Sequence, residues 1–582
     1  MILRHLSWRG RLMLAICVFL IAGQVYLDLR IPEYMGVITD HLQAGTATDV
    51  IARDGAAMVV CALLSLLLAA CTAVLAARVS ADLCHTLRRL LFSSVGAFSR
   101  QDVDGFSASS LITRSTNDVY QIQQFLPRAI NMVVKAPMIG IMAVWKISSS
   151  SFQWTSVTVI AMVVLLAAFS VMLYRGMPYM RSMQRHVDSV NKMTREGLEG
   201  ARGIRAYNAE SRQQARLTEA SGRLLDNSIT LVRVMAPMHA LASSMMNFLT
   251  LAIYWVGAGI IQSAAGPGEQ MSLFSDMIVF TSYATQIISA VMMASGIIRG
   301  LPRFMVSSRR ICEVIDHVPS VCDPDAPVVT EARGRVEFRD VTFRYPGTDR
   351  EVLSGVSFVA EPGETVAVIG PTASGKSTLL SLIPRLYDIT SGSVLVDGAD
   401  VRSYTFEDLN SRIGYVPQTA VVFSGTVRDN VNYGGVSDSR DDADVERALR
   451  VAQLWEFVSG LPDGLDTDLA QHGWSLSGGQ RQRLAIARAV CRGPRIYLFD
   501  DTFSALDYRT DRDVRDALGR ETSGATRIVV AQRVGTIMDA DRIVVLDSGR
   551  VVGIGTHDEL LESCPLYREI AESQTEACDA RR

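Results

Sequence analysis

The sequence lacks several features that would place it among secreted, metal-stapled or nucleic-acid-binding proteins. Its nine cysteines are scattered and include no C-x-x-C pair, so neither a disulfide framework nor a zinc site is expected. The formal net charge of -3 gives no sign of nucleic-acid binding. No small-residue cleavage site accompanies the first apolar run, so we expect a retained membrane anchor rather than a removed signal peptide.

Long apolar runs are abundant in the first half of the chain. Hydrophobic residues make up 48% of the sequence while 20% of residues are charged, which indicates an apolar part and a polar part. A spanning helix needs roughly 20 mostly apolar residues. The third run is the weakest because Lys135 and Pro137 interrupt it, and Lys135 can snorkel toward the inner surface. The six candidate spans lie near 12–30, 54–78, 129–146, 152–175, 237–262 and 273–298.

The distribution of basic residues predicts how these spans are oriented. Arg and Lys are concentrated before the first span, between spans two and three, and between spans four and five, and are sparse in the other loops. Because basic loops stay on the cytoplasmic side, we expect a multi-pass protein of the cytoplasmic membrane with a cytoplasmic N-terminus. Trp145 and Trp154 flank one outer turn, as expected of an interfacial aromatic belt.

The two long inner connections, 79–128 and 176–236, are expected to continue the spans as helices into the cytoplasm. Segments 116–119 and 203–210 sit where the chain must reverse. They can be contacts that transmit force to the second half of the protein, or simply solvated helix tips, which composition alone favours. Asp276 can contact a substrate or lie at the membrane interface. The methionines of the last two spans can line a cavity or pack between helices.

The composition changes after the sixth span. Asp and Pro residues break the apolar pattern, which indicates a domain boundary. We therefore predict a transmembrane domain at 1–307, a linker at 308–334, a nucleotide-binding domain at 335–572 and a C-terminal tail at 573–582.

A phosphate loop of the form G-x-x-x-x-G-K-S follows a buried strand, 365–369, and opens a helix, which is the context that the motif requires. Its glycines let backbone N–H groups surround phosphates at the positive end of that helix. Lys376 is expected to reach the outer phosphates of ATP and Ser377 to supply an oxygen to Mg²⁺. Asp500 ends a second buried strand and is expected to hold the metal shell. The ATP-binding set is Gly370, Pro371, Thr372, Ala373, Ser374, Gly375, Lys376, Ser377 and Thr378.

About a hundred residues further on stands Leu476-Ser477-Gly478-Gly479-Gln480. With the phosphate loop and six spans, this motif makes the chain resemble a half-transporter of the ATP-binding cassette (ABC) superfamily with the exporter-type (type IV) fold. The resemblance implies a polytopic α-helical membrane domain of six helices followed by an α/β P-loop NTPase cassette. It also implies a partner subunit, because two cassettes meet head to tail around two ATP molecules.

The resemblance favours force-transmitting contacts over solvated tips at 116–119 and 203–210, and it assigns further roles by position. Tyr345 matches the aromatic residue that stacks on adenine, and Gln418 matches a glutamine that senses Mg²⁺ and contacts the membrane domain. Asp507 matches a loop that crosses to the partner's site. The signature residues that serve the partner's ATP are Ser477, Gly478, Gly479 and Gln480.

Two positions depart from the family pattern. Asp501 stands where the family has the Glu that polarises the attacking water, and one methylene less leaves the carboxylate roughly 1.5 Å short. Gln532 stands where the family has His, and an amide cannot become a cation. Neutral drift with a slow site is one explanation; the degenerate subunit of a heterodimer, paired with a subunit bearing Glu and His, is the one we prefer. The run 470–473 also departs from the usual pattern, which puts coupling to the membrane domain in doubt.

The sequence leaves the direction and cargo of transport open. Export is the default, and a siderophore-type importer with the same fold is the alternative. A homodimeric exporter and a nucleotide-gated regulatory membrane ATPase are further alternatives. The substrate can be a small molecule, a lipid, a peptide or a chelate, because fold does not select among them.

Overall fold

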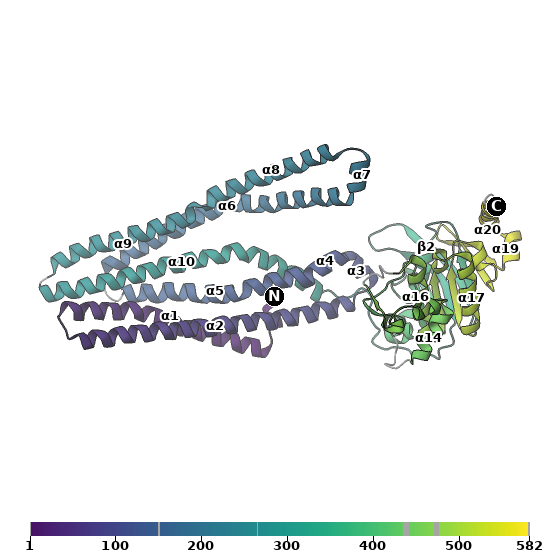
Figure 1. The fold of residues 1–582 in the computed structure, drawn as a ribbon, viewed down its shortest axis with the longest axis horizontal. Helices are drawn as coiled ribbons and strands as arrows, with labels where there is room; N and C mark the ends of the chain where they lie inside the picture. Colours follow the sequence, from purple (N-terminus) through teal and green to yellow (C-terminus); the bar gives the residue numbers. More distant parts are fainter. Residues whose placement is uncertain (1, 149–151, 265, 435–440, 471–475, 580–582) are drawn as a thin grey trace. The chain divides into compact units, whose positions relative to one another are not determined.

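The computed structural model describes residues 2–148, 152–264, 266–434, 441–470 and 476–579. These residues form two compact units (Figure 1). The first unit comprises Met1–Gly96 and Ser109–His317, and the second comprises Ala97–Ala108 and Val318–Arg582. A short piece of the first inner connection therefore belongs to the second unit.

The first unit is entirely helical among its described residues, and it contains six helical stretches long and apolar enough to cross a membrane. The prediction of six spans is thereby confirmed, including the interrupted third one. The helices are α1 (Trp8–Gln43), α2 (Thr48–Gly96), α4 (Ala108–Thr113), α5 (Val119–Ser148), α6 (Phe152–Glu199), α7 (Ala201–Ala206), α8 (Glu210–Met235), α9 (Pro237–Ser263) and α10 (Pro267–Ile315).

Prolines inside these helices leave backbone carbonyls without an intrahelical donor, and at two of them a side chain from a neighbouring helix replaces the missing bond. Pro32 in α1 frees the carbonyl of Asp28, which accepts a hydrogen bond from Gln286 Nε2 at 3.3 Å. Pro127 in α5 frees the carbonyl of Gln123, which accepts from Ser80 Oγ at 3.0 Å. The helices thus remain continuous through their prolines.

Lys135 on α5 does not depend on snorkelling. Its Nζ lies 3.2 Å from Asp28 Oδ2 on α1, and Ser65 Oγ on α2 also donates to the Asp28 carboxylate at 2.5 Å. A charge within a span is stabilised when an opposite charge and polar neighbours face it. The pair fastens the third span to the first, and Asp28 is an intramembrane acid that the sequence pattern did not single out.

Trp154, expected in an aromatic belt, is instead a packing residue. Its side chain is buried, its ring centroid lies 4.5 Å from that of Phe280, and its Nε1 donates to the carbonyl of Ile253 at 3.4 Å. Trp145 remains exposed, as an interfacial residue would. The two tryptophans therefore have different roles although they flank the same turn.

The chain reversals at the inner ends are only partly where the sequence placed them. Segment 116–119 lies inside a continuous helix, in a π-helical turn (Arg114–Asp118) that runs directly into α5. The first reversal occurs earlier, around α3 (Arg100–Phe106). The second reversal is formed by α7 and the start of α8, as expected.

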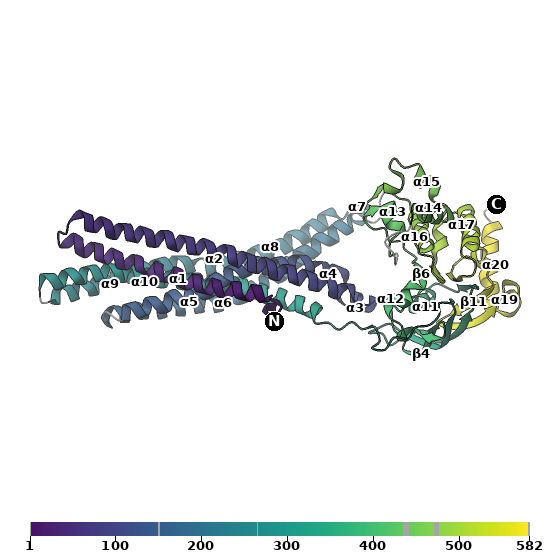
Figure 2. The same ribbon diagram turned by 90° about the horizontal axis from the view of Figure 1, so that it is seen from below.

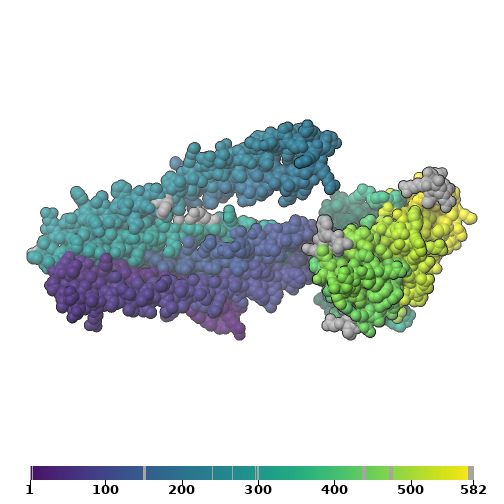
Figure 3. Space-filling view, viewed as in Figure 1, coloured from purple at the N-terminus to yellow at the C-terminus, as the bar shows by residue number. Residues whose placement is uncertain are grey.

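Helix α8 packs on α6, and together they form an arm that stands apart from α5 and α10 near its α7 end (Figures 2 and 3). The tip of this arm is largely exposed, and Tyr207 keeps 86% of its surface accessible. An exposed aromatic at a helix reversal leaves both interpretations of this tip, a contact or a solvated end, still open.

The first reversal does make contacts within the second unit. Asp102 of α3 is buried and accepts hydrogen bonds from the backbone N–H of Ser99 and of Ser320, each at 3.0 Å. Tyr387 donates its hydroxyl to Asp104 at 3.2 Å. For this loop the contact interpretation is therefore preferred over the solvated tip.

The second unit is an α/β domain built around a six-stranded sheet with the order β12-β11-β3-β10-β9-β6. Five neighbouring strands are parallel and β12 is antiparallel. A four-stranded antiparallel sheet, β2-β1-β4-β5, and a two-stranded sheet, β7-β8, complete it. The strands are β1 (Val336–Arg344), β2 (Glu351–Ala360), β3 (Thr365–Ile369), β4 (Ser391–Val396), β5 (Ala399–Asp400), β6 (Ile413–Val416), β7 (Gly425–Thr426), β8 (Asp468–Leu469), β9 (Ile496–Asp500), β10 (Thr526–Val530), β11 (Arg542–Asp547) and β12 (Arg550–Gly555).

Helix α11 and the antiparallel sheet cover one face of this sheet, and α14, α16 and α17 cover the other. Burial on both faces is why its parallel strands read as continuous apolar runs. Side chains alternate along β3: Val366 and Val368 belong to one buried cluster, and Ala367 and Ile369 belong to the other. The predicted α/β class is confirmed. The helices are α11 (Lys376–Leu382), α12 (Phe406–Ser411), α13 (Val427–Val431), α14 (Asp442–Val451), α15 (Trp455–Ser459), α16 (Gly478–Arg492), α17 (Tyr508–Glu521), α18 (Val534–Ile537), α19 (His557–Ser563) and α20 (Pro565–Asp579).

Candidate functional site

The expected site residues lie at the carboxyl ends of four parallel strands, along one edge of the main sheet. Strand β3 ends at the phosphate loop, β9 ends at Asp500, β10 precedes Gln532 and β6 precedes Gln418. Val530 is paired with Asp500 on one side and with Val368 on the other. Because carboxyl ends of parallel strands share an edge, residues more than a hundred positions apart meet there.

The phosphate loop has a shape that only small residues permit. A Cβ on Gly370 would lie 1.9 Å from the carbonyl oxygen of Leu546, inside any allowed contact. Gly375 has φ of 101°, and a Cβ there would lie 2.8 Å from Leu353 Cδ2. Glycine is therefore required at both positions by the backbone itself. The loop wraps around a cavity of about 460 Å³.

Lys376 occupies the centre of this loop and is buried. Its Nζ donates to the carbonyl oxygens of Gly370 at 2.9 Å and Pro371 at 2.7 Å. Burial lowers the pKa of the Lys376 ammonium, because a desolvated cation loses its hydration. An anion in the loop would restore that lost stabilisation, which makes the site suited to phosphate.

The expected metal-holding residues are close together. Ser377 Oγ donates to Asp500 Oδ1 at 2.7 Å, and burial raises the pKa of the Asp500 carboxyl. A hydroxyl and a buried carboxylate are oxygen ligands of the kind that Mg²⁺ accepts beside substrate phosphates. These residues would hold Mg²⁺ against the outer phosphates of a bound nucleotide.

The two atypical residues, Asp501 and Gln532, contact each other directly. Gln532 Nε2 donates to Asp501 Oδ2 at 2.8 Å, and Gln418 Nε2 approaches the same oxygen at 3.4 Å. Asp501 has a left-handed backbone with φ of 46°, a conformation uncommon outside glycine. Burial raises the pKa of its carboxyl. Both amide donors therefore meet the same oxygen, Oδ2, of this carboxylate.

The C-terminal helix supports this pair in a way that the sequence did not indicate. Gln574 of α20 donates through Nε2 to the carbonyl of Gln532 and accepts at Oε1 from the N–H of Val534, both at 2.8 Å. The residue lies in the segment expected to be a plain tail. No sequence signal could have identified it, because its role depends on a helix returning to the sheet edge.

Tyr345 lies beside the loop but not among the residues that line its cavity. Its hydroxyl is 2.9 Å from Thr378 Oγ1, and its ring meets that of Tyr387 edge-on at 5.3 Å. Arg350 lines the cavity instead. The stacking role of Tyr345 stays a prediction.

The signature residues form the start of helix α16. Ser477 Oγ accepts from the N–H of Gln480 at 3.2 Å, and Gln480 Oε1 accepts from the N–H of Ser477 at 2.7 Å. This capping box leaves the N–H groups of Gly478 and Gly479 available at the helix end. Asp507 caps α17 by accepting from Thr510 N at 3.1 Å. Residues 471–473, where the sequence departs from the family run, lie outside the described residues.

Comparisons with known proteins agree with both halves of the chain. The family model for the ABC transporter transmembrane region matches residues 14–291, and the ABC transporter model matches residues 353–504. An ABC transporter ATP-binding protein of Mycobacterium tuberculosis (strain ATCC 25618 / H37Rv) is 40% identical over 551 residues, covering 94% of this chain and 93% of that protein.

Two further comparisons bear on the type of transporter. An ATP-dependent lipid A-core flippase of Pseudomonas fluorescens is 32% identical, with 85% of this chain and 81% of that protein covered. The solved structure of a bacterial Atm1-family ABC exporter with ATP bound superposes with a TM-score of 0.82 at 25% identity, covering 97% of this chain and 98% of that one.

Proposed function

The chain belongs to the ABC transporter family, and we propose that it is the degenerate-site subunit of a heterodimeric exporter of the cytoplasmic membrane. Its own phosphate loop would hold Mg²⁺ and ATP and turn the nucleotide over slowly. Its signature would complete an active site on a partner that carries Glu and His. The N-terminus and the cassette would face the cytoplasm, where ATP is found.

The observation that carries this proposal is the contact between Gln532 and Asp501. A catalytic base must come within hydrogen-bond reach of the attacking water. Here the acid is one methylene shorter than the family's Glu, and an amide that cannot become a cation holds its Oδ2 at 2.8 Å. The donors of the phosphate loop and the Ser377–Asp500 pair are intact, which supports binding without efficient cleavage.

Similar proteins support the direction of transport. A flippase and an exporter are among the proteins that resemble this chain over most of its length. We therefore prefer export to import. The membrane domain would then take its substrate, a small molecule, lipid, peptide or chelate, from the cytoplasm or the inner leaflet.

Comparing equivalent lysine variants in the two subunits tests the proposal. In the complete heterodimer, the partner's phosphate-loop lysine changed to Ala should abolish ATP hydrolysis and transport, because that site cleaves ATP. Lys376→Ala should reduce turnover only partly, because its loop mainly holds ATP. Equal loss from the two variants would contradict the assignment, as would rapid hydrolysis by this chain in the absence of any partner.

A further inference from the structure

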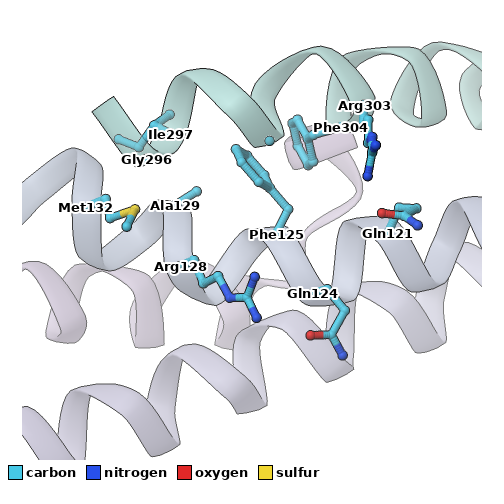
Figure 4. Close-up of a pocket in the computed structure, with 11 residues that line it drawn as sticks. Gln121, Gln124, Phe125, Arg128, Ala129, Met132, Gly296, Ile297, Arg303 and Phe304 are labelled. Atoms are coloured by element: carbon cyan, nitrogen blue, oxygen red, sulfur yellow. The ribbon is translucent and has the colours of Figure 1, made fainter. Parts of the chain in front are cut away.

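A second cavity, of about 470 Å³, lies in the membrane unit between α5 and α10 (Figure 4). Its volume is within the range of about 300–1,000 Å³ that is usual for small-ligand sites. Helix α5 contributes one face at helical spacing and α10 contributes another. The lining residues are Gln121, Gln124, Phe125, Arg128, Ala129, Met132, Gly296, Ile297, Gly300, Arg303 and Phe304.

Two glycines create the hollow on the α10 side. A Cβ on Gly300 would lie 2.6 Å from Phe125 Cε2, and one on Gly296 would lie 3.0 Å from Met132 Cε. The Phe125 ring therefore rests directly on bare backbone and points toward α10 (Figure 4). The ring centroids of Phe125 and Phe304 are 4.8 Å apart. These side chains form an apolar, aromatic wall.

The polar part of the cavity is cationic. Arg128 and Arg303 line it from opposite helices, Gln121 and Gln124 add amide groups, and no Asp or Glu is among the lining residues. None of these four side chains has a hydrogen-bond or ion-pair partner within the part of the chain that the structure describes.

The other described basic side chains on α5 and α10 behave differently, because each is paired with an acid. Lys135 pairs with Asp28 at 3.2 Å, Arg310 with Asp118 at 3.3 Å and Arg309 with Glu313 at 3.4 Å. Lys146 pairs with Glu33. The two arginines of the cavity are thus the exceptions among these side chains, and their exposed guanidinium groups are available to pair with an anionic ligand.

We propose that this cavity binds the transported substrate and that it selects amphipathic organic anions. A phosphate, sulfonate or carboxylate would accept charge-assisted hydrogen bonds from Arg128 and Arg303, since guanidinium groups match these oxyanions. An aromatic or alkyl body would lie against Phe125, Phe304 and Met132, because methionine adapts to varied apolar shapes. An ammonium group would meet two cations and no acid.

The position of the cavity fits substrate loading, and here the inference rests on the proposed function. The residues from Gln121 to Met132 and from Gly296 to Phe304 lie at the ends of the third and sixth spans that are proposed to face the cytoplasm. Arg303 and Phe304 are neighbours on α10, and Phe125 lies one turn before Arg128 on α5. An anion from the cytoplasm, or from the inner leaflet, would therefore meet the arginines and the aromatic wall at the same depth.

Direct binding measurements test this inference without requiring turnover or a partner. The full-length chain is placed in nanodiscs of zwitterionic phosphatidylcholine and dialysed against 2-naphthyl phosphate or 2-naphthylmethylammonium, with empty discs as blanks. We expect the phosphate to bind at least about tenfold more tightly than the ammonium compound, because only the anion pairs with the arginines. Equal binding of the two probes would overturn the proposal.

Variants then locate the bound anion. Arg128→Gln and Arg303→Gln should each weaken 2-naphthyl phosphate binding by about tenfold, while Arg128→Lys should retain most of it. Arg309→Gln is the matched control, because that arginine lies on the same helix outside the cavity and should leave binding unchanged. Gly300→Ala should also weaken binding, since its methyl displaces Phe125. Unchanged binding in both Gln variants, in protein that still binds Mg²⁺ and ATP, would overturn the assignment.

The origin of the anion is distinguished by repeating the dialysis in nanodiscs that contain phosphatidylglycerol. Competition would indicate a lipid headgroup, whereas an unchanged affinity would indicate a soluble anion; both results support an anion site. The outcomes for the cavity and for the nucleotide site are separate. Lost anion selectivity with slow ATP hydrolysis refutes the cavity alone, and rapid hydrolysis with retained selectivity refutes the degenerate site alone.

Discussion

Restoring the two atypical residues should convert the slow nucleotide site into an active one. In Asp501→Glu the carboxylate extends by roughly 1.5 Å, and a misplacement of about 1 Å can cost about a hundredfold in rate. Gln532→His removes the amide that donates to Asp501 Oδ2 at 2.8 Å. A hydrogen bond to a charged group is worth about 1.5–3 kcal/mol, or about ten- to a hundredfold. The two changes are in contact, so their effects should not simply add.

The assay is phosphate release by the purified full-length chain, paired only with copies of itself in nanodiscs. Such a pair contains two identical phosphate loops and two intact signatures, so the double variant has two consensus sites. We expect it to hydrolyse ATP about a hundredfold faster than the parent chain, with each single variant in between. Adding Lys376→Ala to the double variant should remove the gain. A parent chain that is already as fast as the double variant would refute the reasoning.

Three further outcomes follow from the same geometry. Gly478→Asp has room for the new side chain but places a negative charge where a γ-phosphate should dock, so heterodimer ATPase should fall at least about a hundredfold while ATP binding at Lys376 persists. Burial raises the folded-state pKa of Asp500, so its ionised form destabilises the nucleotide-free fold above that pKa. Asp500→Asn should therefore raise Tm at neutral pH, lose this gain as pH falls through the pKa, and abolish Mg²⁺-dependent ATP binding. Gln574→Ala removes two hydrogen bonds of about 1 kcal/mol each, so hydrogen exchange at the Val534 amide should accelerate by about tenfold or more, with Ser573→Ala as the control.

Local patterns in the sequence predicted the elements and the chemistry of the nucleotide site well. Length and apolarity identify a span whether or not a residue such as Lys135 interrupts it, because the average over a helix decides insertion. The phosphate loop is recognisable because glycine is required at both ends: Gly370 lies against the carbonyl of Leu546, and Gly375 has a positive φ. In the same way, an apolar run that ends in an acid predicted Asp500 at the end of a buried strand.

Contacts between distant segments could not be predicted in this way. The partner of Lys135 is Asp28 on another helix, and finding it requires the rotation of both helices about their axes. Trp154 looked interfacial because its place in the sequence gives its depth in the membrane but not the direction of its side chain. In the fold its ring faces Phe280. The bond between Gln532 and Asp501 depends on β9 and β10 being neighbours, which strand order alone decides.

The most direct test of the central claim is the identity of the nucleotide that this chain retains. Purified full-length protein is incubated with Mg²⁺ and ATP labelled on its α-phosphate, passed rapidly through a desalting column, and its bound nucleotide is released and separated. If the site binds ATP without cleaving it, the released nucleotide should be mostly ATP rather than ADP after many minutes. The Lys376→Ala variant should retain neither ATP nor ADP. Predominant ADP in the parent chain would contradict the account.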